Sequence, residues 1–170
     1  MLTTHQRHLL VRKRLRPLLD EYEVRAKPSG DLVALARKAR LAEELSVYRN
    51  ESRTEVLCTA RTDTPASIIE VDAIEPLGRI RVEHSWGPRI WHVQPAAGEP
   101  IRGRERSRVG AFFGSLFSRV PAHFDFTADE RTAFTVRRRF GLRRRYTVEI
   151  ADDSLDRRLV VVQVLALDVF

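Results

Sequence analysis

The stretch that decides the fold is Thr135-Val136-Arg137-Arg138-Arg139-Phe140-Gly141-Leu142-Arg143-Arg144-Arg145-Tyr146-Thr147-Val148-Glu149-Ile150. Its apolar side chains fall on even-numbered positions, and most of its charged side chains fall on odd-numbered ones. Because side chains alternate between the two faces of a strand, this pattern predicts strands with one buried and one exposed face. Gly141 interrupts the pattern and serves a turn. The stretch therefore predicts a β-hairpin with a basic outer face.

The hairpin is followed by an acidic turn, residues 152–156, and by an apolar segment that ends at Phe170. Asp153 or Ser154 is expected to cap a helix here, since short polar side chains accept hydrogen bonds from free backbone N–H groups. From Leu159 the helix is apolar on almost every side, so other elements must surround it. A sheet closed around the helix would do this and would leave no exposed strand edge. A mainly β fold around a central C-terminal helix is therefore expected.

The rest of the chain repeats one design, in which an alternating apolar run reaches a turn and a second run follows. This design predicts an antiparallel meander of hairpins. Residues 36–44 are rich in helix formers and are expected to be helical. The predicted runs and turns are 22–25, 28–31 and 32–35; 69–72, 75–78 and 79–82; 90–93, 96–99 and 100–102; 45–50 and 55–61 around 50–53; a turn at 85–89; and a connecting loop with a helical turn at 107–119.

Length and composition predict one compact domain over residues 1–170, since 43% of the residues are hydrophobic. The formal net charge is +7, and nearly all of the positive charge is arginine. Such a surface indicates an anionic partner such as phospholipid headgroups or nucleic acid, with solubility alone as the competing explanation. Cys58 is the only cysteine, which excludes an internal disulfide and a cysteine zinc cage and favours the reducing cytoplasm. No signal-peptide core is expected, and the apolar stretch 159–170 is too short to span a bilayer, so we expect at most peripheral membrane contact.

Four motifs, in this order, carry a family resemblance. They are Tyr22-Glu23-Val24 after a basic start, Val120-Pro121-Ala122-His123-Phe124-Asp125-Phe126, Phe140-Gly141-Leu142-Arg143-Arg144-Arg145-Tyr146-Thr147-Val148-Glu149-Ile150, and Asp156-Arg157-Arg158-Leu159 with the apolar run to Asp168. The chain resembles the LURP-one-related and phospholipid-scramblase-like proteins, which share the tubby C-terminal fold. The resemblance covers essentially the whole chain and implies a closed β-barrel of about twelve strands, threaded by a hydrophobic C-terminal helix.

The resemblance implies less about activity. Tubby-like domains bind phosphoinositides, and scramblases are associated with lipid movement and calcium. The scramblase calcium segment has acidic residues where this chain has Arg143, Arg144 and Arg145, and cations there would repel calcium. The cysteine cluster of animal scramblases is also absent from the sequence. We therefore expect neither a metal site nor lipid scrambling.

The predicted site is the basic face of the hairpin, because guanidinium groups pair with phosphate oxygens through two parallel hydrogen bonds. The competing interpretation is an ordinary solvated strand face. Arg138 and Arg144 have the apolar parity, so they mark either the barrel rim or a register change at the turn. The predicted anion-binding residues are Arg137, Arg139, Arg143 and Arg145.

Other candidates are weaker. An aromatic loop is expected to cover a barrel end rather than enter a lipid interface. The basic N-terminal stretch 7–19 could form a membrane-surface helix, but Pro17 breaks its pattern. Three histidines, each without a carboxylate partner at ligand spacing, are expected to be structural. The loop residues are Phe112, Phe113, Leu116 and Phe117, and the histidines are His84, His92 and His123.

The sequence offers no nucleophile with a base, no phosphate-binding glycine loop and no paired carboxylates. We therefore expect a non-enzymatic protein without a cofactor. The leading hypothesis is binding of an anionic phospholipid headgroup by the arginine hairpin. The alternatives are nucleic-acid binding by the same surface and a scaffold that docks an acidic protein partner.

Overall fold

Twelve strands and a C-terminal helix make up the regular structure of the described residues. The computed structural model describes residues 2, 5–39, 41–63, 68–83, 89–106, 121–139 and 144–169. The elements are β1 (His8–Arg16), β2 (Leu19–Ala26), β3 (Leu32–Ala39), β4 (Glu44–Tyr48), β5 (Val56–Asp63), β6 (Ile68–Asp72), β7 (Pro76–Glu83), β8 (Ile90–Pro95), β9 (Ile101–Glu105), β10 (Ala122–Ala128), β11 (Arg131–Arg139), β12 (Arg145–Ile150) and α2 (Arg157–Val169).

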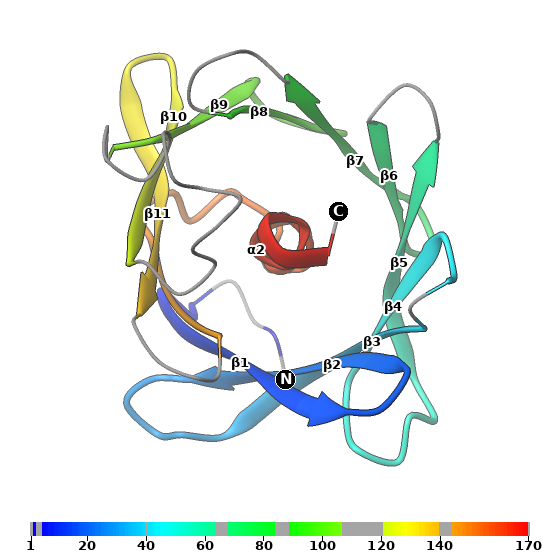
Figure 1. Cartoon of the computed structure of the whole chain (residues 1–170). Coiled ribbons are helices and arrows are strands. Elements are labelled where there is room, and N and C mark those ends of the chain that lie inside the picture. Colours follow the sequence, from blue (N-terminus) through cyan, green and yellow to red (C-terminus); the bar gives the residue numbers. More distant parts are fainter. Residues whose placement is uncertain are drawn as a thin grey trace.

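The strands form a closed antiparallel barrel that encircles α2 (Figure 1). Each strand pairs with its neighbours in the chain, as in a meander, and the first strand, β1, pairs with the last, β12. In this closing pair His8 lies opposite Glu149 and Arg12 lies opposite Arg145. The predicted closed barrel of twelve strands around a C-terminal helix is therefore confirmed.

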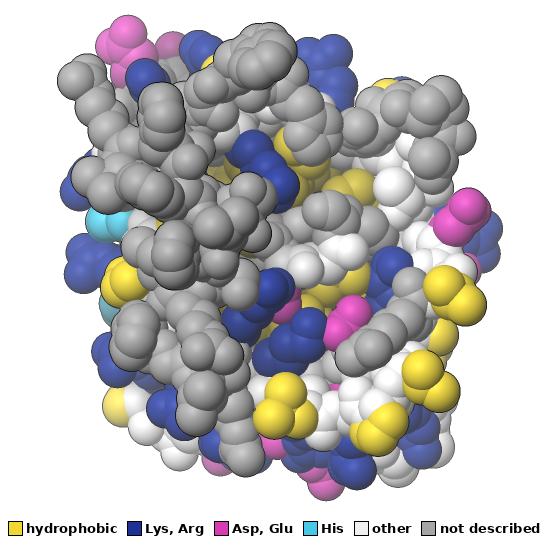
Figure 2. Space-filling model, in the orientation of Figure 1, with side chains coloured by type: hydrophobic (Ala, Val, Ile, Leu, Met, Phe, Trp, Pro, Cys, Tyr) yellow, Lys and Arg dark blue, Asp and Glu magenta, His cyan; other side chains and the backbone are white. Residues whose placement is uncertain are grey.

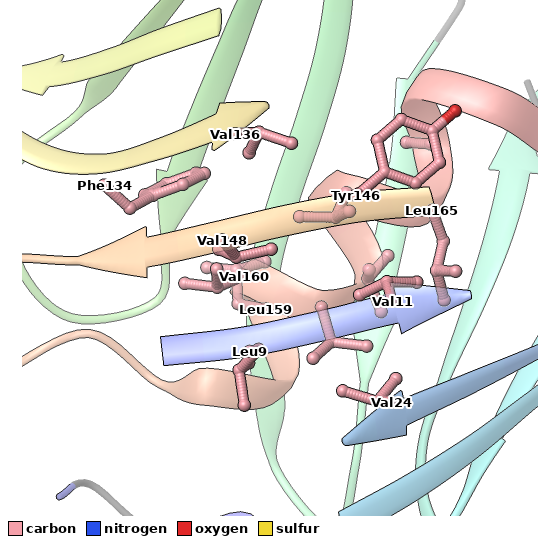
Figure 3. Packing of buried hydrophobic residues seen from close by; sticks show 14 of the residues in the cluster. Leu9, Val11, Val24, Phe134, Val136, Tyr146, Val148, Leu159, Val160 and Leu165 are labelled. Atoms are coloured by element: carbon pink, nitrogen blue, oxygen red, sulfur yellow. The ribbon is translucent and has the colours of Figure 1, made fainter. Parts of the chain in front are cut away.

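The alternation that predicted the hairpin is present in β11 and β12. Val136, Tyr146 and Val148 have no exposed surface, whereas the odd-numbered arginines of the same strands are exposed. Figure 3 shows the apolar side chains of β1, β2, β11 and β12 gathered beside those of α2. Every residue of α2 from Leu159 to Ala166 is buried, since strands surround the helix. Within the described residues, no helix is both long and apolar enough to cross a membrane.

The helix begins at Arg157, three residues after the last of the two residues that were expected to cap it. The backbone N–H of Arg158 donates to the Asp156 carboxylate at 2.8 Å, so Asp156 is the capping residue. The expectation of a cap at Asp153 or Ser154 was wrong. The carboxylate of Asp152 instead accepts the backbone N–H of Ser154 at 2.8 Å, which forms a turn before the helix. Several short acidic residues compete for this role, and only the path of the chain selects among them.

The predicted helix over residues 36–44 is absent, because residues up to Ala39 continue β3 and β4 begins at Glu44. Ala34 and Ala36 are fully buried, and Ala36 lies opposite Tyr22 of β2 and Val47 of β4. The pairing with two neighbouring strands outweighs the modest helix propensity of these residues.

The turn predicted at 75–78 lies at 73–75, because β7 already begins at Pro76. Gly78 is part of that strand and has a φ of 146°. A Cβ atom there would lie 2.4 Å from the carbonyl oxygen of Gln94 on β8, so the close approach of the two strands requires glycine. The other predicted strand pairs are present. Residues 84–88 of the predicted turn and all of the predicted loop 107–119 lie outside the described residues.

Candidate anion-binding site

The structure places three of the four predicted arginines on the outer surface of the barrel. Arg137 and Arg139 lie on β11 and Arg145 lies on β12, and all three are exposed. Arg143 lies outside the described residues. The prediction that these odd-numbered side chains face outward is confirmed for the three that are described.

The strand register brings two of these arginines together with a third that the sequence did not point to. Arg139 lies directly opposite Arg145, and Arg145 lies directly opposite Arg12 of β1. Side chains that face each other across antiparallel strands have Cβ atoms about 5 Å apart, and like charges in this position destabilise a sheet. We call Arg12, Arg145 and Arg139 the arginine ladder. It spans three adjacent strands, β1, β12 and β11.

The carboxylate that lies opposite the ladder on β2 binds other residues. Within the described part of the chain, no ladder arginine forms an ion pair. Arg12 lies opposite Glu23 of β2, but the carboxylate of Glu23 binds Arg14 and, at 3.0 Å, Arg25. The ladder therefore holds three guanidinium groups side by side without a neutralising partner among the described residues.

A groove of about 540 Å³ lies beside the ladder. Within it, Arg137 faces His123 of β10 on one side and Thr147 of β12 on the other. No described residue of the lining is acidic, so the groove, called here the hairpin groove, favours an anion. Its described lining consists of Pro121, Ala122, His123, Arg137, Arg138, Arg139 and Thr147.

The surroundings of this groove shift the pKa of His123. Burial lowers the pKa of its imidazole, and Arg106 and Arg137 lower it further, against the opposing effect of Asp125. The Nε2 atom of His123 lies 3.3 Å from the Asp125 carboxylate. His92 likewise lies 3.1 Å from the carboxylate of Glu83. The expectation that these histidines have no carboxylate partner was wrong, because residues two apart on a strand, or diagonal to each other across a strand pair, share one face.

Arg138 and Arg144 lie at the barrel rim. The register between β11 and β12 shows no shift, and Arg138 lies opposite Tyr146. Arg144 forms an ion pair with the buried carboxylate of Asp168 near the end of α2, and Lys13 lies 3.5 Å from the same carboxylate. Figure 2 shows Lys, Arg and acidic side chains together in this mouth of the barrel. Arg144 and Lys13 therefore hold the end of α2 and are separate from the ladder.

Two further kinds of candidate site are a metal site and a reactive thiol. The described residues contain no cluster of metal-ligating side chains. Cys58 is buried, and burial raises the pKa of its thiol to about 12, so the reactive thiolate is scarce at neutral pH. The aromatic residues Phe112, Phe113, Leu116 and Phe117, together with His84, lie outside the described residues. What the site offers is a set of guanidinium donors that suit phosphate oxygens.

The ladder shows what sequence patterns miss. Arg12 has the outward parity of β1, but more than 120 positions separate it from Arg139 in the numbering. Only the closure of the barrel between β1 and β12 makes the two part of one site. A comparison of the sequence with models of known protein families and with curated proteins found no match.

Proposed function

We propose that this protein is a non-enzymatic binding protein of the cytoplasm that attaches peripherally to membranes by holding an anionic phospholipid headgroup on the arginine ladder. The observation that carries the proposal is the unpaired row of Arg12, Arg145 and Arg139. Three facing cations cost folding free energy, and a phosphate group placed between them would remove that cost and accept their hydrogen bonds.

Two further features support this function. Arg137 and the hairpin groove continue the positive surface next to the ladder, so a headgroup with more than one phosphate would find donors on both. The resemblance to LURP-one-related and scramblase-like proteins also agrees with it, since tubby-like domains bind phosphoinositides. Each basic side chain near an anionic membrane surface contributes about 1 kcal/mol of attraction.

The test is sedimentation of the purified protein with neutral phosphatidylcholine vesicles and with vesicles that also contain a phosphoinositide. We expect binding only to the second kind. Replacing two ladder residues, Arg139→Glu/Arg145→Glu, should lower binding by at least roughly thirtyfold, because two attractive charges of about 1 kcal/mol each are lost and two repulsive charges are added.

A matched control separates the site from net charge. Arg49→Glu/Arg61→Glu replaces two arginines that already pair with Glu55 and Glu44. Either double variant lowers the formal net charge from +7 by four, to +3. The control should therefore retain most of the binding. Equal losses in both variants, or no vesicle binding at all, would contradict the proposal. Binding of an RNA or DNA oligonucleotide in place of vesicles would favour the nucleic-acid alternative.

A further inference from the structure

A second basic groove lies on another part of the barrel wall. It has a volume of about 350 Å³ and lies over β6 to β9. Its outward side chains form a row in register, in which Arg81 of β7 lies opposite His92 of β8, and His92 lies opposite Arg102 of β9. Val93 and Ile101, both nearly fully buried, also contribute to its lining. We call it the β7–β9 groove.

The cations of this groove are only partly neutralised. No described residue that lines it is acidic. Arg79, at its side, binds Glu70 at 3.2 Å, and His92 binds Glu83 at 3.1 Å. Neither Arg81 nor Arg102 forms an ion pair within the described residues. Two guanidinium groups thus flank one imidazole across three strands, and neither forms an ion pair of its own among the described residues.

The electrostatics of Glu83 report the local field. The hydrogen bond from His92 lowers the pKa of this exposed carboxyl group, and the charges of His92, Arg81 and Arg102 lower it further. The carboxylate of Glu83 is thus held in its charged form by the same cations that face the groove. An anion in the groove would meet the same positive potential.

We propose that the β7–β9 groove binds the phosphate group of a soluble phosphomonoester, with Arg81 and Arg102 donating to its oxygens from the two sides of His92. Guanidinium groups on the two strands that flank β8 match the oxygens of a tetrahedral phosphate. The organic part of the ligand would lie against Ile68 and Pro100, which also line the groove.

The position of the groove favours a dissolved ligand over a lipid. The arginine ladder lies on β11, β12 and β1, and β10 separates these strands from β9. Because the wall curves into a closed barrel, β8 and β9 face a different direction from β11 and β1 (Figure 1). A flat membrane that touches the ladder would therefore leave the β7–β9 groove facing water. The choice of a dissolved ligand rests on the proposed function, whereas the binding of phosphate rests on the cations of the groove alone.

The test is a titration of the full-length protein with sodium phosphate at constant ionic strength, following the imidazole signals of His92 by NMR. We expect a saturable shift that chloride does not produce. Arg81→Gln/Arg102→Gln should weaken the apparent affinity at least tenfold, whereas Arg139→Gln/Arg145→Gln on the ladder should leave it unchanged. Circular dichroism checks that both variants are folded, and Arg81→Lys/Arg102→Lys, which keeps the charge without the planar fork, should restore only part of the affinity.

The outcomes separate this site from the ladder. A shift that does not saturate, or that persists in Arg81→Gln/Arg102→Gln, would overturn the proposal. A shift that is lost only in the ladder variant would assign the phosphate to the arginine ladder, and this result would also overturn the proposal. Vesicles that contain phosphatidic acid carry the same phosphomonoester in a membrane. If they perturb His92 as free phosphate does, the assignment to a soluble ligand is wrong.

Discussion

Two neighbouring outer faces of the barrel are both rich in arginine and differ in their carboxylates. On β1, β2 and β3, four arginines lie within ion-pair distance of two buried glutamates, Glu21 and Glu23. On β1, β12 and β11, the three arginines of the ladder face one another without such partners. We call the first set the paired face; its arginines are Arg14, Arg16, Arg25 and Arg37.

The difference shows why counts of arginine do not locate a binding site. On the paired face, Arg14 also reaches Glu51 at 2.6 Å, so its charge is used within the fold. A guanidinium group satisfied in this way has less to offer a ligand, because the ligand would have to displace a carboxylate. The ladder keeps its charge and its donors, at a cost in folding free energy. We therefore expect the paired face to contribute stability and the ladder to contribute binding.

The largest effect on stability should come from the paired face. Glu23→Gln removes the carboxylate that binds both Arg14 and Arg25, and hydrogen bonds to charged groups contribute about 2 kcal/mol. We expect the free energy of unfolding to fall by about that amount in urea denaturation. Glu55→Gln, in an exposed pair with Arg49, should cost less than about 1 kcal/mol. Equal costs at the two positions would contradict the contrast between buried and exposed pairs.

The same carboxylate gives stability a dependence on pH. Burial raises the pKa of Glu23, but hydrogen bonds from Arg25 and Arg14 outweigh burial and lower it below its ordinary value of 4.5. A group whose pKa is lower in the folded protein stabilises it above the unfolded pKa, and this contribution is lost as the pH falls through the folded pKa. As the pH is lowered below 4.5, the free energy of unfolding should therefore fall less steeply in Glu23→Gln than in the wild type, as measured by urea denaturation at each pH.

Salt should act mainly on the ladder. Arg139 and Arg145 are exposed, and no ladder arginine forms an ion pair within the described residues. The screening length falls from about 10 Å at 0.1 M salt to about 3 Å at 1 M. Raising sodium chloride from about 0.1 M to about 0.5 M should weaken binding to phosphoinositide vesicles roughly tenfold in the sedimentation assay. Binding that is insensitive to salt would mean that apolar contacts, and not the ladder, hold the membrane.

His123 provides an internal probe of the hairpin groove. Arg106 and Arg137 help to lower the pKa of its imidazole, so an anion bound beside Arg137 should raise that pKa by favouring the charged ring. An NMR titration of His123 with and without a soluble phosphoinositide headgroup measures this shift. In Arg137→Gln the pKa without ligand should be higher than in the wild type, and the ligand should raise it less. A downward shift on binding would place the anion elsewhere.

The smallest effect should be a gain in stability. Arg139→Gln removes one of two like charges that face each other, because Arg139 lies directly opposite Arg145. The free energy of unfolding should therefore rise by about 0.3 kcal/mol. Arg61→Gln, which removes a partner of Glu44, should change it in the opposite direction. Urea denaturation at low salt measures both. A loss of stability in Arg139→Gln would show that its charge already has a stabilising partner.

Much of the fold followed from local patterns. The even-numbered apolar residues from Val136 to Ile150 predicted the buried side of β11 and β12, and the all-apolar helix predicted a sheet closed around it. The predictions failed where propensity opposed pairing, as at Ala36, and where several polar residues could serve one role, as at the helix cap Asp156. In both places the decisive contacts come from residues or chain paths that a local window does not contain.

The sequence by itself determined which side chains point outward, because alternation along a strand fixes the face of each residue. It thereby placed Arg137, Arg139 and Arg145 on the surface. Only the tertiary structure decided which of these charges have an ion-pair partner among the described residues. Cross-strand register places Arg12 opposite Arg145 and aligns Arg81, His92 and Arg102. The packing of the strands also brings Glu23 within ion-pair distance of Arg14 and Arg25. The reason is that Coulomb interactions and hydrogen bonds depend on distance in space, which the closure of the barrel sets independently of separation along the chain.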